Sequence, residues 1–560
     1  MDLSSAKPLK LTAHSLLDHG SPYNALLSTL TTTLRKGLGN RAKAIAVLHP
    51  SSEPRSLSEA QPSNPPIIYI GLILNTEHAF RLVDHGPAAD NPDPEAARQF
   101  RELWGDKAEL RRFKDGSIVE SVVWDVKNAD ERAQVPFFIV CHLLARHCGV
   151  EASAVRNWQS SYDAVLRLPE SITTLYQAAA ASMGFKAAMT AFDSLVKSIK
   201  SLDDGLPLAV LNISPVSESL RYTNVFGPVA LPTSLSSVLP SCARYFPVMD
   251  INIEFEKSGR WPDDLRAIQK IKLAFFEQLG SALMASVDGL RASVVIGDGV
   301  STSEIQDIAS LEIVTPEGWA FSARIWHDRE VTLLDKMIDD KPHVPKHVKK
   351  KLQQMQNPEQ ASAEAKNRQA ALEAKEIYMR RFIHSPRHHR VIAALSHRFT
   401  AYASTVRLVK RWLASHWLLG GHVREEAVEL LCAYIFLTGG DASSSRDAQR
   451  ESIPGTRERG FALVVEFLKD WEWANGLFVP VQGDQDIPDG AAGDARIPSH
   501  AGGRTGVWRI STEFDREGYM WTSAGPDAVV ARRIRALAKA AWTTLEGMDG
   551  VDFDVKVCMS

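Results

Sequence analysis

Polar and apolar positions form their clearest pattern in residues 245–283, which read first as a strand and then as a long helix. Within residues 248–255 the polar side chains fall at every second position, and they are Asp250, Asn252 and Glu254. Side chains at i, i+2 and i+4 lie on one face of a strand, so these groups point the same way. From residue 265 to residue 283 apolar side chains recur at spacings of three and four, which predicts an amphipathic helix.

A strand of carboxylates beside such a helix is what a polymerase-type nucleotidyltransferase uses to hold metal ions. Two divalent cations about 4 Å apart clamp the transferring phosphoryl group, which requires closely placed carboxylates. Here Asn252 is neutral, and the glycine-rich turn expected upstream is reduced to Phe226-Gly227-Pro228, where proline removes an N–H that a phosphate would need. We interpret the site as a nucleotidyltransferase centre that has lost its catalytic activity. An amphipathic edge strand with polar groups in water is the alternative.

Further strands are predicted in residues 206–213, 292–296, 308–314 and 319–326. With residues 248–255 they make a mixed sheet of about five strands, which together with the helical residues 151–200 indicates an α/β or α+β domain. Residues 334–381 are rich in Lys, Ala, Gln and Glu and poor in aromatic side chains. That composition predicts an exposed helix or a mobile linker outside any core.

The first block, residues 1–150, mixes helical and strand patterns and reads as an α/β domain. Three cations, Arg111, Arg112 and Lys114, precede a turn at Asp115-Gly116 and an apolar strand, which predicts a hairpin. These cations are candidates for contact with RNA phosphates. A solvated rim, or pairing with carboxylates, is the ordinary alternative for such a cluster.

A helical domain is predicted in residues 346–490, where apolar side chains keep three–four spacing over several segments. The face beside the first apolar stripe carries Arg407, Lys410 and Arg411. This basic ridge is a second candidate for contact with an RNA backbone. The next helix offers salt-bridge partners instead, and these are Glu425, Glu426 and Glu429. Both interpretations stay open because ion pairs between neighbouring helices are common.

Composition narrows the class of protein. The 560 residues suggest three or four domains, and 44% hydrophobic and 23% charged residues are ordinary for a globular protein. A net charge of −3 argues against coating nucleic acid by bulk electrostatics, so any RNA contact must be local. Five scattered cysteines fit a reducing compartment, and Cys141 and Cys148 are expected in a core because no second Cys/His pair has zinc-finger spacing. No apolar run is long enough to span a membrane.

Five stretches carry a resemblance to a known family, and they are RRFKDGSIVESVVW, LPLAVLNISPVSESLRYTNVF, FEKSGRWPDDLRAIQKIKLAF, STVRLVKRWLASHWL with EEAVELLCAYIF, and PGTRERGFALVVEFLKDWEW. In this order they resemble the nucleolar RNA-associated protein family, Nrap. The family is similar to two tandem copies of a CCA-adding enzyme, and this chain resembles one and a half copies.

The resemblance implies four domains, the third to the sixth of the family's six. Residues 1–150 would be the third, an α/β domain, and residues 151–345 the fourth, a nucleotidyltransferase-like domain. Residues 346–490 would be the fifth, a helical domain like those of poly(A) polymerase and OAS. Residues 491–560 end in a would-be strand and would be the truncated start of a sixth, α/β domain, so the chain is expected to be a fragment.

The resemblance also implies a non-catalytic structural subunit of the small-subunit processome (90S pre-ribosome) in the nucleolus and nucleus. Asp250, Asn252 and Glu254 match former metal-binding positions, so we expect no catalytic residues, no metal and no cofactor. The implied partners are pre-ribosomal RNA and the snoRNP assembly, an RRM-containing rRNA-processing protein and casein kinase II subunits, with no membrane. Two alternatives remain: an active metal-dependent nucleotidyltransferase of CCA-adding or poly(A)-polymerase type, and a protein-only scaffold without RNA contact.

Overall fold

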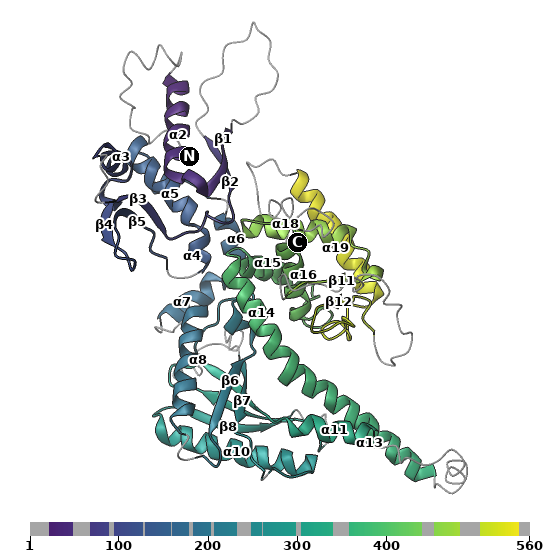
Figure 1. Cartoon of the computed structure of the whole chain (residues 1–560). Coiled ribbons are helices and arrows are strands. Elements are labelled where there is room, and N and C mark those ends of the chain that lie inside the picture. The colour runs from purple at the N-terminus through teal and green to yellow at the C-terminus, as the bar shows by residue number, and fades with distance from the viewer. Residues whose placement is uncertain are drawn as a thin grey trace.

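The structure is a computed structural model. It describes residues 22–48, 68–88, 94–126, 129–157, 159–178, 183–202, 206–231, 248–259, 261–297, 304–339, 358–439, 453–481 and 505–547. Along the chain these residues form an N-terminal α/β part, a central sheet domain and a C-terminal helical part (Figure 1).

The N-terminal part contains α2 (Pro22–Leu38), β1 (Ala42–Leu48), β2 (Tyr69–Leu74), β3 (Val83–Ala88), α3 (Pro94–Trp104), β4 (Glu109–Arg112), β5 (Ile118–Val123), α4 (Ala129–Ala133) and α5 (Val135–Leu143). Strands β1 and β2 pair antiparallel, and a second sheet has the order β3-β5-β4. The predicted hairpin is confirmed, because Arg112 pairs with Ile118 across its turn. Cys148 is buried in this part's apolar core as expected, whereas Cys141 is half-buried.

The central sheet has the order β6-β7-β10-β9-β8. Its strands are β6 (Val210–Pro215), β7 (Val248–Phe255), β8 (Arg291–Ile296), β9 (Ala309–Val314) and β10 (Ala320–Trp326). Strands β7 and β10 run parallel at the centre, and the other neighbours pair antiparallel. The predicted five-stranded mixed sheet is therefore confirmed, with β6 beginning later than the sequence pattern suggested.

Helices close the apolar face of this sheet. In β7 the buried apolar residues are Met249, Ile251, Ile253 and Phe255, which alternate with the polar row. They share one core with α8 (Phe185–Lys200) and α10 (Leu265–Ser286). Asp264 caps α10, since its Oδ1 accepts a hydrogen bond of 2.7 Å from the backbone N of Ala267. The strand and the helix read from the sequence are thus both present.

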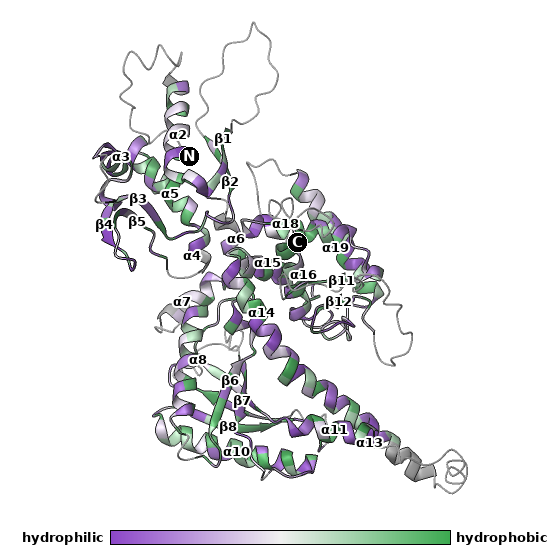
Figure 2. Ribbon diagram, in the orientation of Figure 1, coloured by the Kyte–Doolittle hydropathy of each residue, from purple (hydrophilic) through white to green (hydrophobic). Residues whose placement is uncertain are grey.

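The segment predicted as an exposed helix or linker is described at residues 334–339 and 358–381, and its second part packs one side against the sheet domain. Residues 340–357 lie outside the described residues. The second part contains α13 (Pro358–Tyr378), which lies against α11 (Arg329–Asp339) and continues through the π-helical turn η8 (Met379–His384). Ala371, Ala374, Tyr378 and Phe382 are buried in the core of the sheet domain. Figure 2 shows hydrophilic and hydrophobic residues alternating along α13, so the helix is polar on average although a few of its apolar residues are buried. The predicted boundary at residue 346 therefore falls before a helix that belongs to the sheet domain.

The C-terminal part contains α14 (Ser385–Arg398), α15 (Tyr402–Ser415), α16 (Glu425–Thr438), α18 (Arg457–Asp470), β11 (Leu477–Phe478), β12 (Ile510–Ser511) and α19 (Ala528–Gly547). A separate domain from residue 491 is not what the structure shows, because Val530 and Ile534 of α19 lie in the same core as α15, α16 and α18. The expected final strand of that block lies outside the described residues.

Two short helices join the parts. Tyr162 of α6 (Gln159–Val165) lies in the core of the C-terminal helical part, although α6 precedes the sheet domain in the chain. The next helix is α7 (Glu170–Ala178). Within the described segments, the longest helices are too polar to cross a lipid bilayer.

Candidate functional site

The candidate site is the polar face of the central sheet, centred on β7. Asp250 retains access to solvent, Asn252 is 8% exposed and Glu254 is half-buried. The two carboxylates are four residues apart, which places their Cα atoms about 13 Å apart along an extended strand. The residues beside this polar row on β10 add no acid, since Ser322 lies beside Asp250, Arg324 beside Asn252 and Trp326 beside Glu254. A pair of metal ions about 4 Å apart needs carboxylates that are much closer together.

Asn252 fastens a covering helix to this face. Its Nδ2 donates a hydrogen bond of 2.8 Å to the backbone oxygen of Arg381 in η8. A second contact holds the same helix, because Trp326 Nε1 on β10 donates to the hydroxyl of Tyr378 at 2.8 Å. An ionised carboxylate only accepts hydrogen bonds and could not replace the asparagine donor. The neutral residue therefore suits a contact within the protein better than it suits a metal.

Arginine side chains supply positive charge around the same face. Arg324 Nη1 lies 3.3 Å from Asp307 Oδ2, and Arg381 Nη1 lies 3.4 Å from the same oxygen. Burial raises the pKa of Asp250, and the positive charge of Arg324 acts in the opposite direction, with a smaller contribution from Arg381. Two fixed guanidinium groups near this carboxylate would repel a divalent cation.

Lysine and acidic side chains form a closed ion network beside the site. Lys272 on α10 is fully buried, and its Nζ lies 3.2 Å from Asp307 and 2.6 Å from Glu330. Glu330 also accepts a hydrogen bond of 2.9 Å from Gln269. These acids are already neutralised by the protein's own cations. Across the residues that the structure describes, no group of three or more His, Cys, Asp and Glu side chains is placed to hold a metal ion.

The turn expected to face a triphosphate lies against other elements. The backbone oxygen of Pro228 accepts a hydrogen bond of 2.7 Å from Gly184, at the start of α8. The turn that bonds to the backbone of Asp250 is instead the one directly after β6. There the N–H groups of Val216 and Ser217 donate to the Asp250 carbonyl at 3.0 and 3.2 Å. The sequence analysis did not consider this turn as a phosphate-binding site, although its place after a predicted strand was a usable signal. Both of its N–H groups already donate to Asp250, so they are not available to a phosphate.

A second polar centre joins the sheet domain to the helical part. We call it the Glu429 cluster: Glu429 of α16, Arg221, Thr223, His388 of α14 and Lys410 of α15. The Glu429 carboxylate is completely buried and lies 3.1 Å from Arg221, 2.6 Å from Thr223 and His388, and 2.8 Å from Lys410. Arg221 ends η6 (Glu218–Arg221), the turn that follows β6. Burial alone would raise the pKa of Glu429, but Arg221 and Lys410 hold it well below its ordinary value.

The basic ridge predicted on α15 lies at this junction. Lys410 is fully buried and its Nζ also contacts Glu425 at 2.8 Å, so the structure favours ion pairing over contact with phosphate for this residue. A buried ammonium that is paired twice offers no surface to RNA. Glu425 and Glu429 are the partners that the sequence had suggested.

The other two cations of the ridge face aromatic rings. Arg407 is 6% exposed, donates to the backbone oxygen of Val225 at 3.3 Å, and lies 4.9 Å from the ring centre of Phe185. Arg411 is half-buried and lies 5.5 Å from the ring centre of Phe226. Of the two interpretations of this ridge, contacts within the protein are the one that the structure supports for Arg407 and Lys410, because α15 packs this face against residues that precede the sheet strand β7. Contact of Arg411 with RNA stays a prediction.

The N-terminal cations are accessible. Arg111 and Arg112 lie on β4, an edge strand whose residues are all exposed, and Lys114 follows in the turn. Arg111 pairs with Glu109 at 2.6 Å, as the alternative reading of this cluster allows. Contact of Arg112 and Lys114 with RNA stays a prediction. The structure does not bring this cluster together with the polar face of β7, since they belong to different sheets.

Comparison with protein families gives three successive matches. Residues 2–149 match the model of Nrap protein domain 3, and residues 161–397 match the Nrap protein nucleotidyltransferase domain 4. Residues 399–559 match the Nrap protein PAP/OAS1-like domain 5. The predicted order of a nucleotidyltransferase-like domain and a polymerase-like helical domain is confirmed. The third match continues through the block from residue 491 that was expected to begin a sixth domain.

Two curated relatives cover nearly the whole chain. U3 small nucleolar RNA-associated protein 22 of Schizosaccharomyces pombe is 30% identical over 543 residues, which are 94% of this chain and 44% of that protein. Nucleolar protein 6 of Homo sapiens is 27% identical over 556 residues, 95% of this chain and 43% of that protein. The chain therefore spans less than half the length of the relatives it matches.

Two solved structures align with much of this chain at low sequence identity. A cytoplasmic RNA terminal U-transferase aligns with 71% of this chain and 98% of its own at 10% identity and a TM-score of 0.34. The mtPAP structure in its apo form aligns with 85% of this chain and 94% of its own at 9% identity and a TM-score of 0.36.

Proposed function

This chain belongs to the Nrap protein family, and from that premise we propose that it is part of a non-catalytic structural subunit of the small-subunit processome. The proposal places it in the nucleolus, where it would support the processing of pre-18S ribosomal RNA. The names of the relatives support this assignment, since one is a U3 small nucleolar RNA-associated protein and another a nucleolar protein. An RRM-containing protein and casein kinase II are the proposed protein partners.

The observation that carries the non-catalytic part of the proposal is the role of Asn252. At the position where a two-metal site needs a carboxylate, this amide donates to the backbone of Arg381 and holds η8 across the face. Arg324 lies beside Asn252 on β10 and adds a positive charge, whereas a metal site requires negative charge. The polymerase-like fold would then serve as a rigid shape on which other components assemble.

RNA contact, as proposed here, is local and resides on the N-terminal edge strand. Arg112 and Lys114 are exposed there. Each phosphate contact releases condensed counterions, so a small cluster gives a shallow dependence of affinity on salt. A protein-only scaffold would show no such dependence.

Nucleotide transfer is tested with the whole chain, a labelled RNA primer and each nucleoside triphosphate, in the presence of Mg²⁺ or Mn²⁺. We expect no primer extension, and we expect isothermal titration with Mn²⁺ and nucleoside triphosphate to give no binding heat. Asp250→Ala is the control for any trace activity. If extension occurs and Asp250→Ala abolishes it, the chain is an active enzyme and the proposal fails.

RNA contact is tested by fluorescence anisotropy with a structured pre-rRNA fragment across a range of salt. The variant Arg112→Ala with Lys114→Ala should lower the slope of log affinity against log salt by up to about two, one for each cation. Lys366→Ala with Arg368→Ala on the exposed part of α13 removes the same charge elsewhere and serves as the control. Equal slopes for the two variants would remove the edge strand as an RNA site.

A further inference from the structure

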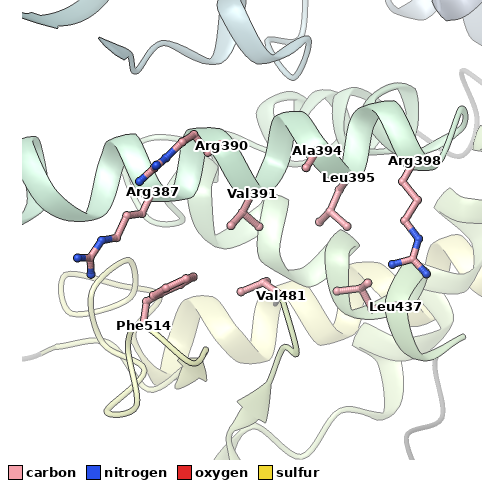
Figure 3. Close-up of a pocket in the computed structure, with 9 residues that line it drawn as sticks. All are labelled: Arg387, Arg390, Val391, Ala394, Leu395, Arg398, Leu437, Val481 and Phe514. Atoms are coloured by element: carbon pink, nitrogen blue, oxygen red, sulfur yellow. The ribbon is translucent and has the colours of Figure 1, made fainter. Parts of the chain in front are cut away.

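A groove lies between α14 and the C-terminal segment that carries β11 and β12, away from the polar face of β7. Its volume is about 620 Å³, and its walls come from α14, α16 and the residues around Val481 and Phe514. Figure 3 shows arginine side chains at both ends of α14 in this view, with a row of aliphatic side chains between them. Neither the metal-site positions nor the Glu429 cluster contributes to it.

The charged side chains that line the groove are all arginines. Arg387, Arg390 and Arg398 line it and are exposed, and among the residues that the structure describes none of the three forms an ion pair. No acidic side chain is among the lining residues of the described chain. Arg387 and Arg398 are eleven positions apart on one helix, which separates them by about 16 Å at 1.5 Å per residue. The groove therefore presents two cationic ends at a fixed distance.

The floor between these ends is aliphatic. Val391 and Leu395 of α14 face Leu437 of α16 and Val481 across the groove (Figure 3). Nucleic-acid bases bind such surfaces poorly, because single-stranded RNA is held by stacking on aromatic rings. The one ring that lines the groove, Phe514, already has the guanidinium of Arg387 5.7 Å from its centre. Aliphatic side chains of a peptide match this floor better than RNA does.

We propose that this groove is the docking site for an acidic peptide segment of a partner protein. The segment would carry carboxylates near both ends and aliphatic side chains between them. Its carboxylates would pair with Arg387 and Arg390 at one end and with Arg398 at the other, where bidentate guanidinium geometry favours carboxylate. Its aliphatic side chains would be buried against Val391 and Leu395. This inference holds whether or not the sheet domain is catalytic, because the two sites share no residue.

Binding is tested with the whole chain and a fluorescein-labelled synthetic peptide of about 12 residues, a helical length that matches the spacing of the arginines. The peptide has Glu at both ends and Leu between, and a second peptide has Ser in place of each Leu. Arg387→Glu with Arg398→Glu reverses the end charges, and Ala394→Trp fills the groove without changing charge. Lys366→Glu with Arg368→Glu on α13 makes the same charge change at a distance. Circular dichroism confirms that each variant is folded.

We expect the Glu/Leu peptide to bind and the Glu/Ser peptide to bind at least about tenfold more weakly. Both groove variants should weaken the Glu/Leu peptide by about tenfold or more, while the α13 control leaves its affinity unchanged. Absence of peptide binding, or equal losses in the groove and α13 variants, would overturn the proposal. A competition experiment with labelled oligouridine gives another outcome that would overturn the proposal. In that outcome oligouridine binds through these arginines and displaces the peptide, and Ala394→Trp changes neither the affinity for oligouridine nor the affinity for the peptide.

Discussion

The most exacting prediction concerns Glu429→Gln in the cluster that joins the two large parts of the chain. The substitution keeps the size of the side chain and removes its charge. Arg221, His388 and Lys410 stay buried around it, with side chains that are 3%, 6% and 0% exposed. Removing one member of a buried, hydrogen-bonded ion pair costs about 3–5 kcal/mol, because the remaining charge has lost its partner. Arg221 and Lys410 both pair with this carboxylate, and only Lys410 has a second carboxylate, Glu425, beside it. We therefore expect a loss within that range, arising mainly at Arg221.

Urea and thermal unfolding of the whole chain, followed by tryptophan fluorescence, measure the effect. A loss of about 3–5 kcal/mol in the free energy of unfolding corresponds to a fall in Tm of about 10 °C for a domain of roughly 200 residues. Glu472→Gln is the matched control, because Glu472 pairs with Arg535 at 3.1 Å but is 69% exposed. Exposed pairs contribute about 0–1 kcal/mol. If Glu429→Gln costs no more than Glu472→Gln, the cluster does not hold the parts together.

The pH dependence gives an independent check on the same carboxylate. The folded pKa of Glu429 is lowered, with burial opposing the shift and Arg221 and Lys410 causing it. A lowered folded pKa means that the stabilisation is complete above the unfolded pKa, about 4.3 for glutamate, and is lost as pH falls toward the folded pKa. The difference in stability between the natural chain and Glu429→Gln should therefore be constant at neutral pH and shrink below about pH 4. A difference that grows on acidification would refute this reasoning.

Three further predictions follow from single contacts, and urea unfolding measures each of them. Asn252→Ala should cost about 1 kcal/mol because the backbone oxygen of Arg381 loses its donor, whereas Asp250→Ala, which removes no donor, should cost less. Lys272→Met should cost about 3 kcal/mol because it leaves Glu330 buried without its cation, while Arg266→Met breaks only an exposed pair with Glu304 and should cost under about 1 kcal/mol. Gly460→Ala should cost about 1–3 kcal/mol, since its Cβ would lie 2.9 Å from Thr405 Cγ2 where α15 and α18 approach, and Gly421→Ala, with open space around it, should be nearly neutral. An unchanged stability for any of the first-named variants would contradict the corresponding contact.

Much of the central sheet domain was readable from the pattern of side chains. The alternation in residues 248–255 matches β7, and the three–four spacing that follows matches α10. Both patterns are strong because one face of each element is buried and the other is not. The absence of charge at residue 252 was also readable, since it requires only the identity of the side chain.

The role of Asn252 was not readable in the same way. Its partner, Arg381, is 129 positions away along the chain. Between them lies α13, whose polar composition hid the few apolar positions that fix it to the sheet. A short apolar stripe on a long polar helix gives a weak periodic signal, so composition favoured a linker.

The basic residues show most clearly that the local sequence pattern does not predict which side chains are exposed to solvent. The three cations on α15 and the three near β4 look alike in the sequence, yet Lys410 is fully buried while Arg112 and Lys114 are exposed. Sequence alone determined which residues lie together on a helix face or strand face, because backbone geometry sets that period. Only the tertiary structure decided which face meets another element, because a cation's access to solvent depends on segments such as η6 and α16 that are distant in sequence and supply the opposing charge.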